Sequence, residues 1–223
     1  MSGKLNSQAL ALKHSLEKLI AWLEQQPQER FPVPQKILPL FAGWPELSQA
    51  FLLFLESKPV PDWTLEEKRL LNYLLRLDWQ ANQLLKPLPP EKLFFVLSQR
   101  YEDQAMRMYM LANLRLLPDN EDRQKIALSL YLHHDADAIR DHALIILAGT
   151  GWQQAEDEAK LYWESQDPVK MLVGLNCLST CNSKLLDHYL DLALQSDEHS
   201  LRTVALAIRQ NQRGKDSDAS TDD

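Results

Sequence analysis

Glycine is scarce in this chain of 223 residues, which contains only six glycines and no glycine-rich phosphate loop. The scarcity of glycine and of β-branched runs argues against a substantial β-sheet. The sequence also lacks a Gly-x-Ser-x-Gly nucleophile motif and a His-Glu-x-x-His zinc-binding motif. We therefore expect no catalytic residue and no cofactor.

Long apolar stretches and cysteines are also few. The longest purely apolar run covers the six residues from Ala50 to Leu55, whereas a membrane span needs roughly 20. The first residues show no signal-peptide core. The two cysteines, Cys177 and Cys181, are four residues apart on one predicted helix, and in a reducing compartment they stay free thiols. We therefore expect a cytoplasmic protein that does not enter a membrane.

The charge balance is acidic, with a net charge of −7. Such a chain is poorly suited to neutralising phosphates over a broad surface, so we expect a protein or peptide partner and no nucleic acid. A local basic patch stays open. The oligomeric state is also open, because the apolar segment 45–57 or the helix 5–26 could mediate homodimerisation.

A short pattern returns four times between Asp103 and Leu206. Each copy places an apolar residue before a basic one, and the basic residues are separated by 33, 30 and 32 positions. The residue before the base and those three and four after it share one helical face, which we predict to be buried. The four copies are Met106-Arg107, Ile139-Arg140, Val169-Lys170 and Leu201-Arg202.

Each copy is preceded by an aspartate suited to cap the helix and by an earlier helix. We predict these first helices at 90–100, 120–133, 153–165 and 183–195. Paired helices with a period near thirty residues are typical of stacked α-repeats. The signature at Asp137, Ile139, Arg140, Ala143 and Leu144 and in the later copies resembles the short members of the HEAT-repeat family. The resemblance implies an all-α fold, a superhelical solenoid of antiparallel helix pairs.

The segment before residue 90 is less regular. We predict helices at 5–26, 35–42, 45–57, from Thr64 through a stripe ending at Leu77, and at 79–86, separated by proline-rich joints. Thr64 and Glu67 form a capping-box pattern. The resulting domains are an N-terminal helical cap over 1–89, HEAT-like repeats over 90–212 and a disordered acidic tail over 213–223. Trp79 is expected to pack in a joint and Trp152 to be partly exposed.

The candidate binding surface follows from the resemblance, because second helices line the concave face of a HEAT-like stack. The basic residues have two interpretations: ties to an acid in a neighbouring repeat, which we favour, or an anion-attracting groove. The residues that follow each base are predicted to face a partner, although packing against the next repeat is an equal alternative for Met108 and Met171. The predicted binding residues are Arg107, Met108, Tyr109, Arg140, Asp141, His142, Met171 and Thr203.

Two constellations superficially resemble metal sites. His133, His134 and Asp135 lie at a predicted turn, where adjacent side chains diverge, so we interpret them as a solvated turn. Cys177 and Cys181 with His188 or His199 could form a soft-metal site, but two small core residues are the preferred interpretation. We predict no metal site.

Two functional classes remain. The first is a non-catalytic interaction scaffold that holds a protein or peptide on the concave face. The second is a HEAT-like enzyme, such as a DNA-repair glycosylase or a chromophore lyase. A glycosylase groove is rich in basic and aromatic residues, which the acidic composition disfavours, and repeat similarity alone transfers no activity. We favour the scaffold.

Overall fold

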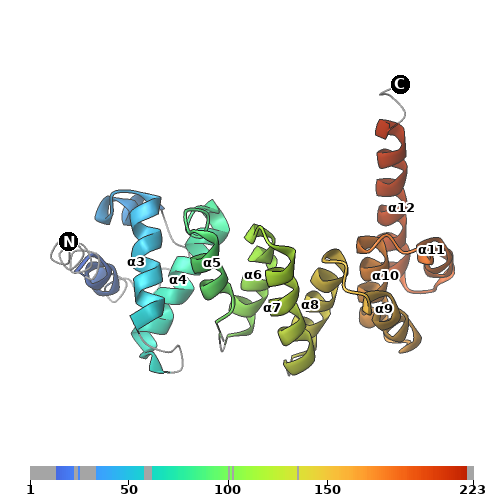
Figure 1. The fold of residues 1–223 in the computed structure, drawn as a ribbon, viewed down its shortest axis with the longest axis horizontal. Coiled ribbons are helices and arrows are strands. Elements are labelled where there is room, and N and C mark those ends of the chain that lie inside the picture. Colours follow the sequence, from blue (N-terminus) through green and yellow to red (C-terminus); the bar gives the residue numbers. More distant parts are fainter. Residues whose placement is uncertain are drawn as a thin grey trace. The chain divides into compact units, whose positions relative to one another are not determined.

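The computed structural model describes residues 14–22, 25, 34–57, 62–99, 101, 103–134 and 136–219. Every regular element within these residues is a helix, which confirms the prediction of an all-α protein (Figure 1). The chain divides into two compact units, Met1–Pro118 and Asp119–Asp223. Residues 90–118 therefore belong to the first unit, whereas the sequence assigned them to the same segment as the later helices.

The first unit is built from helices of unequal length. Residues 14–22 are helical and bury Leu16 and Leu19. The elements that follow are α2 (Pro34–Ile37), the 3-10 helix η1 (Leu38–Leu40), α3 (Trp44–Ser57), α4 (Leu65–Ala81), α5 (Pro90–Leu97), α6 (Gln104–Asn113) and the 3-10 helix η3 (Leu114–Leu116).

Helix α4 begins as the sequence predicts. The amide of Glu67 donates to the Thr64 hydroxyl oxygen at 3.3 Å, and the amide of Thr64 donates to the Glu67 carboxylate at 2.7 Å, which completes the capping box. Its predicted apolar stripe is buried. The separate helix expected at 79–86 is wrong, because α4 continues to Ala81 and ends at Asn82. Asn82 adopts a left-handed conformation with φ 50°, which asparagine tolerates better than most residues.

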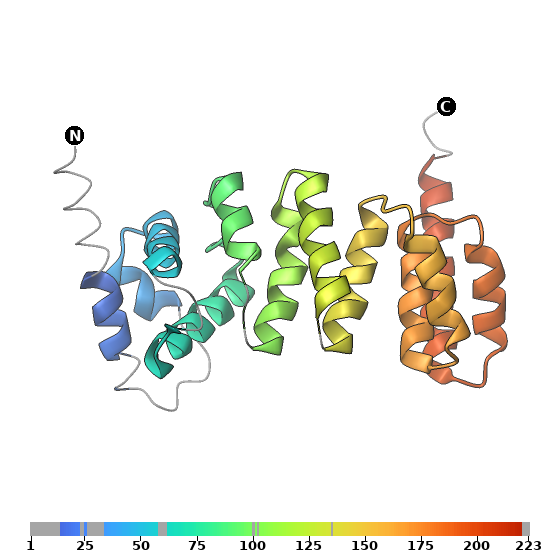
Figure 2. The ribbon, with the colours of Figure 1, turned by 60° about the horizontal axis from the view of Figure 1, so that its bottom comes forward.

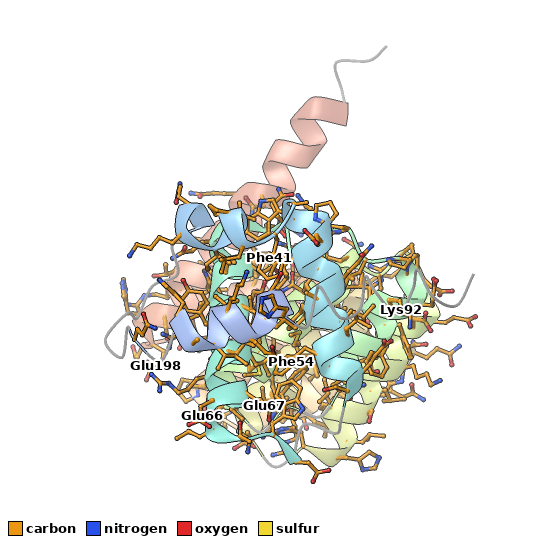
Figure 3. All side chains as sticks on the ribbon, turned by 90° about the vertical axis from the view of Figure 1, so that its left-hand side faces the viewer. Phe41, Phe54, Glu66, Glu67, Lys92 and Glu198 are labelled. Atoms are coloured by element: carbon orange, nitrogen blue, oxygen red, sulfur yellow. The ribbon has the colours of Figure 1, made fainter. Side chains whose placement is uncertain are left out.

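The helices of the first unit pack around aromatic side chains. Phe41 and Phe54 point inward among the helices, whereas Glu66 and Glu67 lie at the edge (Figure 3). Helix α5 contacts α3 and α6, and α6 also contacts α4. Lys92 of α5 donates to Glu56 of α3 at 2.6 Å, a partly exposed pair that adds little to stability.

The second unit is more regular. It contains α7 (Asn120–His133), α8 (Asp137–Gly149), α9 (Ala155–Glu164), α10 (Pro168–Thr180), α11 (Leu186–Gln195) and α12 (His199–Ala219). The pairs α7 with α8, α9 with α10 and α11 with α12 each pack against each other, and three residues separate the two helices of each pair in the sequence (Figure 2). Helix α10 also packs against α8 on one side and α12 on the other, so the second helices lie next to one another in chain order.

A close helix crossing lies at the centre of the second unit. A Cβ atom added to Gly174 of α10 would meet the backbone oxygen of Ala159 of α9 at 2.7 Å, closer than real Cβ contacts allow. Glycine therefore lets the two backbones approach. The core around this crossing includes Leu144, Trp163, Leu175 and Leu190.

The last helix extends into the segment for which the sequence predicts disorder. Helix α12 runs to Ala219, while residues 220–223 lie outside the described part of the chain. Figure 1 shows α12 continuing past the ends of α10 and α11. Among the helices described, none combines the length and apolar character required to cross a bilayer.

Candidate functional site

The second helices α8, α10 and α12 carry equivalent residues at an offset of 31 positions. The small residues Ala143, Gly174 and Ala205 are all buried at matching positions. Leu144 and Leu175 are both fully buried one position later. The equivalent Leu206 of α12 is 51% exposed, because no described helix packs on it.

This offset corrects the predicted register of the third copy. Met106, Ile139 and Leu201 are buried as expected, but Val169 is 62% exposed. The cause is the spacing from the helix start: Lys170 follows the N-cap Asp167 by three residues, whereas Arg140 follows the N-cap Ala136 by four. Lys170 therefore takes the place of Ile139, and Met171 takes that of Arg140.

Only one of the eight predicted binding residues is exposed, and the rest are buried or half-buried. Tyr109 and Asp141 are buried, with 9% of each residue exposed, and Thr203 is exposed. The prediction that all eight face a partner is therefore wrong for the two buried residues. A second helix packed between two neighbours buries more than one face, which periodicity within a single helix does not reveal. The half-buried residues are Arg107, Met108, Arg140, His142 and Met171.

Arg140 and Arg202 bond to groups at the start of their own helix, whereas the charge of Lys170 acts on Asp137 and Asp141 of the neighbouring helix pair. Arg140 pairs with Asp137, which lies three residues earlier in its own helix, and this pair lowers the pKa of the Asp137 carboxyl. Arg202 donates to the carbonyl of Ser196 at 2.6 Å in the preceding turn. Lys170 lies 6.0 Å from the centre of the Tyr162 ring. At α8 and α12 the basic side chains therefore stabilise the start of their own helix.

Contacts between neighbouring helix pairs come instead from hydroxyl groups. The Tyr131 hydroxyl of α7 donates to Glu158 of α9 at 2.6 Å. The Ser183 hydroxyl donates to Glu156 at 2.5 Å. Both pairs are separated by 27 residues, and this shared separation is the only sequence signal by which they could have been found.

Asp141 is the centre of a polar cluster between α8, α9 and α10. A hydrogen bond links its carboxyl to Tyr162, but among the described residues its Oδ1 atom has no hydrogen-bond partner. Burial raises the pKa of the Asp141 carboxyl, and the charges of Lys170 and Arg140 oppose that shift. The cluster joins three helices around a buried carboxylate.

Tyr109 belongs to a second polar cluster, in the first unit. Its hydroxyl donates to Asp78, which is fully buried and also accepts the backbone amide of Leu84 at 2.7 Å. The Tyr109 ring stacks on Trp79, with the ring centres 5.6 Å apart. Trp79 is itself 72% exposed, so the expectation that it packs in a joint is wrong. Tyr109 thus acts inside the fold.

An uncharged face runs along the second helices beside their most buried side, and its Ile145 and Val204 pack against the core of the second unit. In α8 its residues follow the helical spacing of four, three and four, and the offset of 31 carries the same positions to α10 and α12. Only Val173, which α8 and α12 flank, is buried; the others are exposed or half-buried. We call this face the outer stripe: Ala138, His142, Ile145, Gly149, Val169, Val173, Asn176, Thr180, Ser200, Val204, Ala207 and Asn211.

The outer stripe contains one predicted binding residue, His142. Burial lowers the pKa of the His142 imidazole, which favours its neutral form. The stripes of α8 and α10 adjoin, because a Cβ atom on Gly149 would lie 3.2 Å from the Thr180 methyl carbon.

No group of three or more metal-binding side chains occurs among the residues whose placement is described. At the α7–α8 turn, the His134 imidazole accepts the amide of Ala136 at 2.9 Å, which agrees with the interpretation of this segment as a turn. Cys177 is buried in the core, Cys181 is half-buried, and both are free thiols. Burial raises the pKa of Cys177 to about 12.

Comparison of the chain with protein-family models, with curated proteins and with solved structures finds no match in any of the three. The resemblance to HEAT-like repeats therefore rests on the residues themselves, and membership of that family stays a prediction.

Proposed function

We propose that this protein is a non-catalytic scaffold that binds a protein or peptide on the second helices of a HEAT-like solenoid. The observation that carries the proposal is the repetition of buried and outward positions at an offset of 31 residues across α8, α10 and α12. Helix pairs that repeat in this way bury a continuous core, and their outward positions form an extended surface that such proteins use for binding.

The proposed binding surface is the outer stripe. Its exposed aliphatic residue Val169 and half-buried Ile145 and Val204 offer apolar contact to a partner. Apolar contact in the centre of a surface with charges at its edge is the usual composition of a protein interface. In this version of the scaffold hypothesis, the outer stripe takes the place of the predicted binding residues Tyr109 and Asp141, because both of these side chains act within the fold.

A photo-cross-linking amino acid introduced at Ala207 tests the proposal. Ala207 lies on the outer stripe and is exposed; Leu161 of α9 is also exposed but lies on a first helix, so it is the matched control. In a lysate of the native cells we expect a defined protein to cross-link from position 207 and from position 142, and not from position 161. Identical products from positions 207 and 161 would contradict a specific binding face.

Small-angle X-ray scattering tests the solenoid arrangement. A compact domain of this length has a radius of gyration of about 17 Å. A linear stack of helix pairs has a larger value, so we expect the full chain to exceed that figure clearly while remaining monodisperse. A value near that of a compact domain would reject the solenoid and with it the extended surface.

A further inference from the structure

The outer stripe differs in charge from the unit that carries it. Residues 119–223 contain 19 acidic and 10 basic residues, which gives a net charge of −9 with neutral histidines. No Asp, Glu, Lys or Arg occupies any of the twelve stripe positions. The surface is therefore an uncharged strip within a strongly acidic unit.

Carboxylates border the stripe at one end of each second helix. Asp137 begins α8, Asp167 caps α10 and Glu198 directly precedes α12, and all three residues are exposed. Because packed helices lie about 8–10 Å apart, the acids recur at about that spacing along the edge of the strip. Arg140 pairs with Asp137, the charge of Lys170 also acts on Asp137, and Asp167 accepts two helix amides, so part of this border charge is compensated within the fold.

We propose that the outer stripe binds a basic segment of a partner protein, in which aliphatic side chains cover the stripe and Lys or Arg side chains reach the bordering carboxylates. This inference rests on the proposed scaffold function and adds the chemistry of the partner. Charge complementarity selects the occupant: an acidic segment is repelled by a unit of charge −9, whereas a basic one is attracted and oriented. The stripe carries no charge and includes the aliphatic residues Ile145, Val169 and Val204, so a partner that offers aliphatic side chains as well as basic ones covers it better than a purely ionic partner.

Three labelled peptides of 18 residues test the partner chemistry with the full chain. The first is an amphipathic peptide of leucine and lysine, the second replaces lysine with glutamate, and the third replaces leucine with serine. Fluorescence anisotropy should show binding of the first peptide, with affinity falling as salt rises because exposed charges are screened. We expect at least tenfold weaker binding of the other two. Equal binding of the glutamate peptide would overturn the inference.

Two variants locate the binding face. Ala207→Lys places a positive charge on the stripe, and Leu161→Lys adds the same charge at an exposed position of α9. Both sites are exposed, so both variants should fold, which circular dichroism checks. We expect Ala207→Lys to weaken binding of the leucine–lysine peptide at least tenfold and Leu161→Lys to change it less than twofold. Equal weakening by both variants would indicate attraction to net charge alone and would reject the stripe.

The cross-linked partner separates this inference from the proposed function. A segment captured from position 207 that carries Lys or Arg beside aliphatic residues supports both. A captured segment that is acidic or uncharged overturns the inference and leaves the scaffold function standing. Loss of any specific cross-link at the stripe rejects the scaffold function, whatever the synthetic peptides do.

Discussion

Among the described residues, each unit buries one aspartate, and the two side chains are held differently. Asp78 of the first unit is fully buried and accepts two hydrogen bonds, from the Tyr109 hydroxyl and the Leu84 amide. Asp141 of the second unit has one partner in Tyr162, and its Oδ1 atom is without another among the described residues. The first unit, whose helices are unequal in length, depends on a buried carboxylate that accepts two hydrogen bonds. The second unit, whose helix pairs repeat, depends on close packing and tolerates a buried carboxylate oxygen without a hydrogen-bond partner.

Asp78→Ala should cause the largest loss of stability among the substitutions that compare the two units. It leaves the Leu84 amide and the Tyr109 hydroxyl without an acceptor in a buried place, so we expect a loss of about 3 kcal/mol in the stability of the first unit. Hydrogen exchange resolved by peptide should show faster exchange in α3, α4 and α6 than in α8 and α10. Gln80→Ala, at an exposed position of the same helix, is the control. Equal acceleration in both units would contradict the prediction.

Gly174→Ala should have the next largest effect, in the second unit. A glycine within a helix is normally improved by alanine, but here the added methyl group meets the Ala159 carbonyl oxygen at 2.7 Å. We expect the clash to win and to cost about 2 kcal/mol, measured by urea unfolding. Gly149→Ala faces only the movable side chain of Thr180 and should be nearly neutral. The packing interpretation fails if Gly174→Ala is no worse than its control.

Helix caps allow the same substitution to be compared in both units. Thr64 caps α4 through one amide in a reciprocal box, and Asp167 caps α10 through the amides of Val169 and Lys170. Replacing either residue by alanine should cost about 1 kcal/mol. Hydrogen exchange of the backbone amides in the first turn of the affected helix measures this loss of stability. A loss that appears only in the other unit would contradict the assignment of each cap to its own unit.

Asp141→Asn should have the smallest effect and the opposite sign. Burial raises the folded-state pKa of Asp141, so its contribution to stability is fully present below the unfolded-state pKa and is lost as pH rises through the folded-state value. Asparagine does not ionise, so the variant avoids this loss of stability. We expect it to be slightly more stable than the unmodified protein at pH 7, by under about 1 kcal/mol, and equally stable near pH 3, where the Asp141 carboxyl is protonated.

Asp137→Asn provides the control with reversed sign. Arg140 lowers the pKa of the Asp137 carboxyl, so its contribution is present above the unfolded-state pKa and is lost as pH falls through the folded-state value. This variant should therefore be destabilised at pH 7 and unchanged in acid. Thermal unfolding at both pH values decides between the two directions, and destabilisation of Asp141→Asn at pH 7 would contradict the cost assigned to its burial.

Helix positions could be predicted from the sequence because their signals are local. Thr64 with Glu67, and Asp167 with Pro168, mark helix starts that depend on amides within one turn. The burial of Met106, Ile139 and Leu201 follows from helical periodicity in the same way. These signals were sufficient for the all-α class and for the bounds of most elements.

The candidate site could be predicted less well, because it depends on packing between helices. The predicted register of α10 is aligned on Lys170 and not on the N-cap Asp167, which shifts it by one residue. It therefore predicts that Val169 is buried, although this residue is exposed. Tyr109 and Asp141 are predicted to face a binding partner, because the periodicity of one helix does not show that other helices pack on two of its sides. Their actual partners, Asp78 and Tyr162, lie 31 and 21 residues away, and no local pattern connects such pairs.

The reactivity of the two thiols reports local opening of the second unit. Cys181 is half-buried and Cys177 is fully buried, and burial raises the pKa of both thiols, so we expect Cys181 to react with a thiol reagent first. Alkylation of unmodified protein should therefore be biphasic, with the slow phase limited by separation of α10 from its neighbours. The rate of that phase would measure the local opening free energy of the second unit without any label.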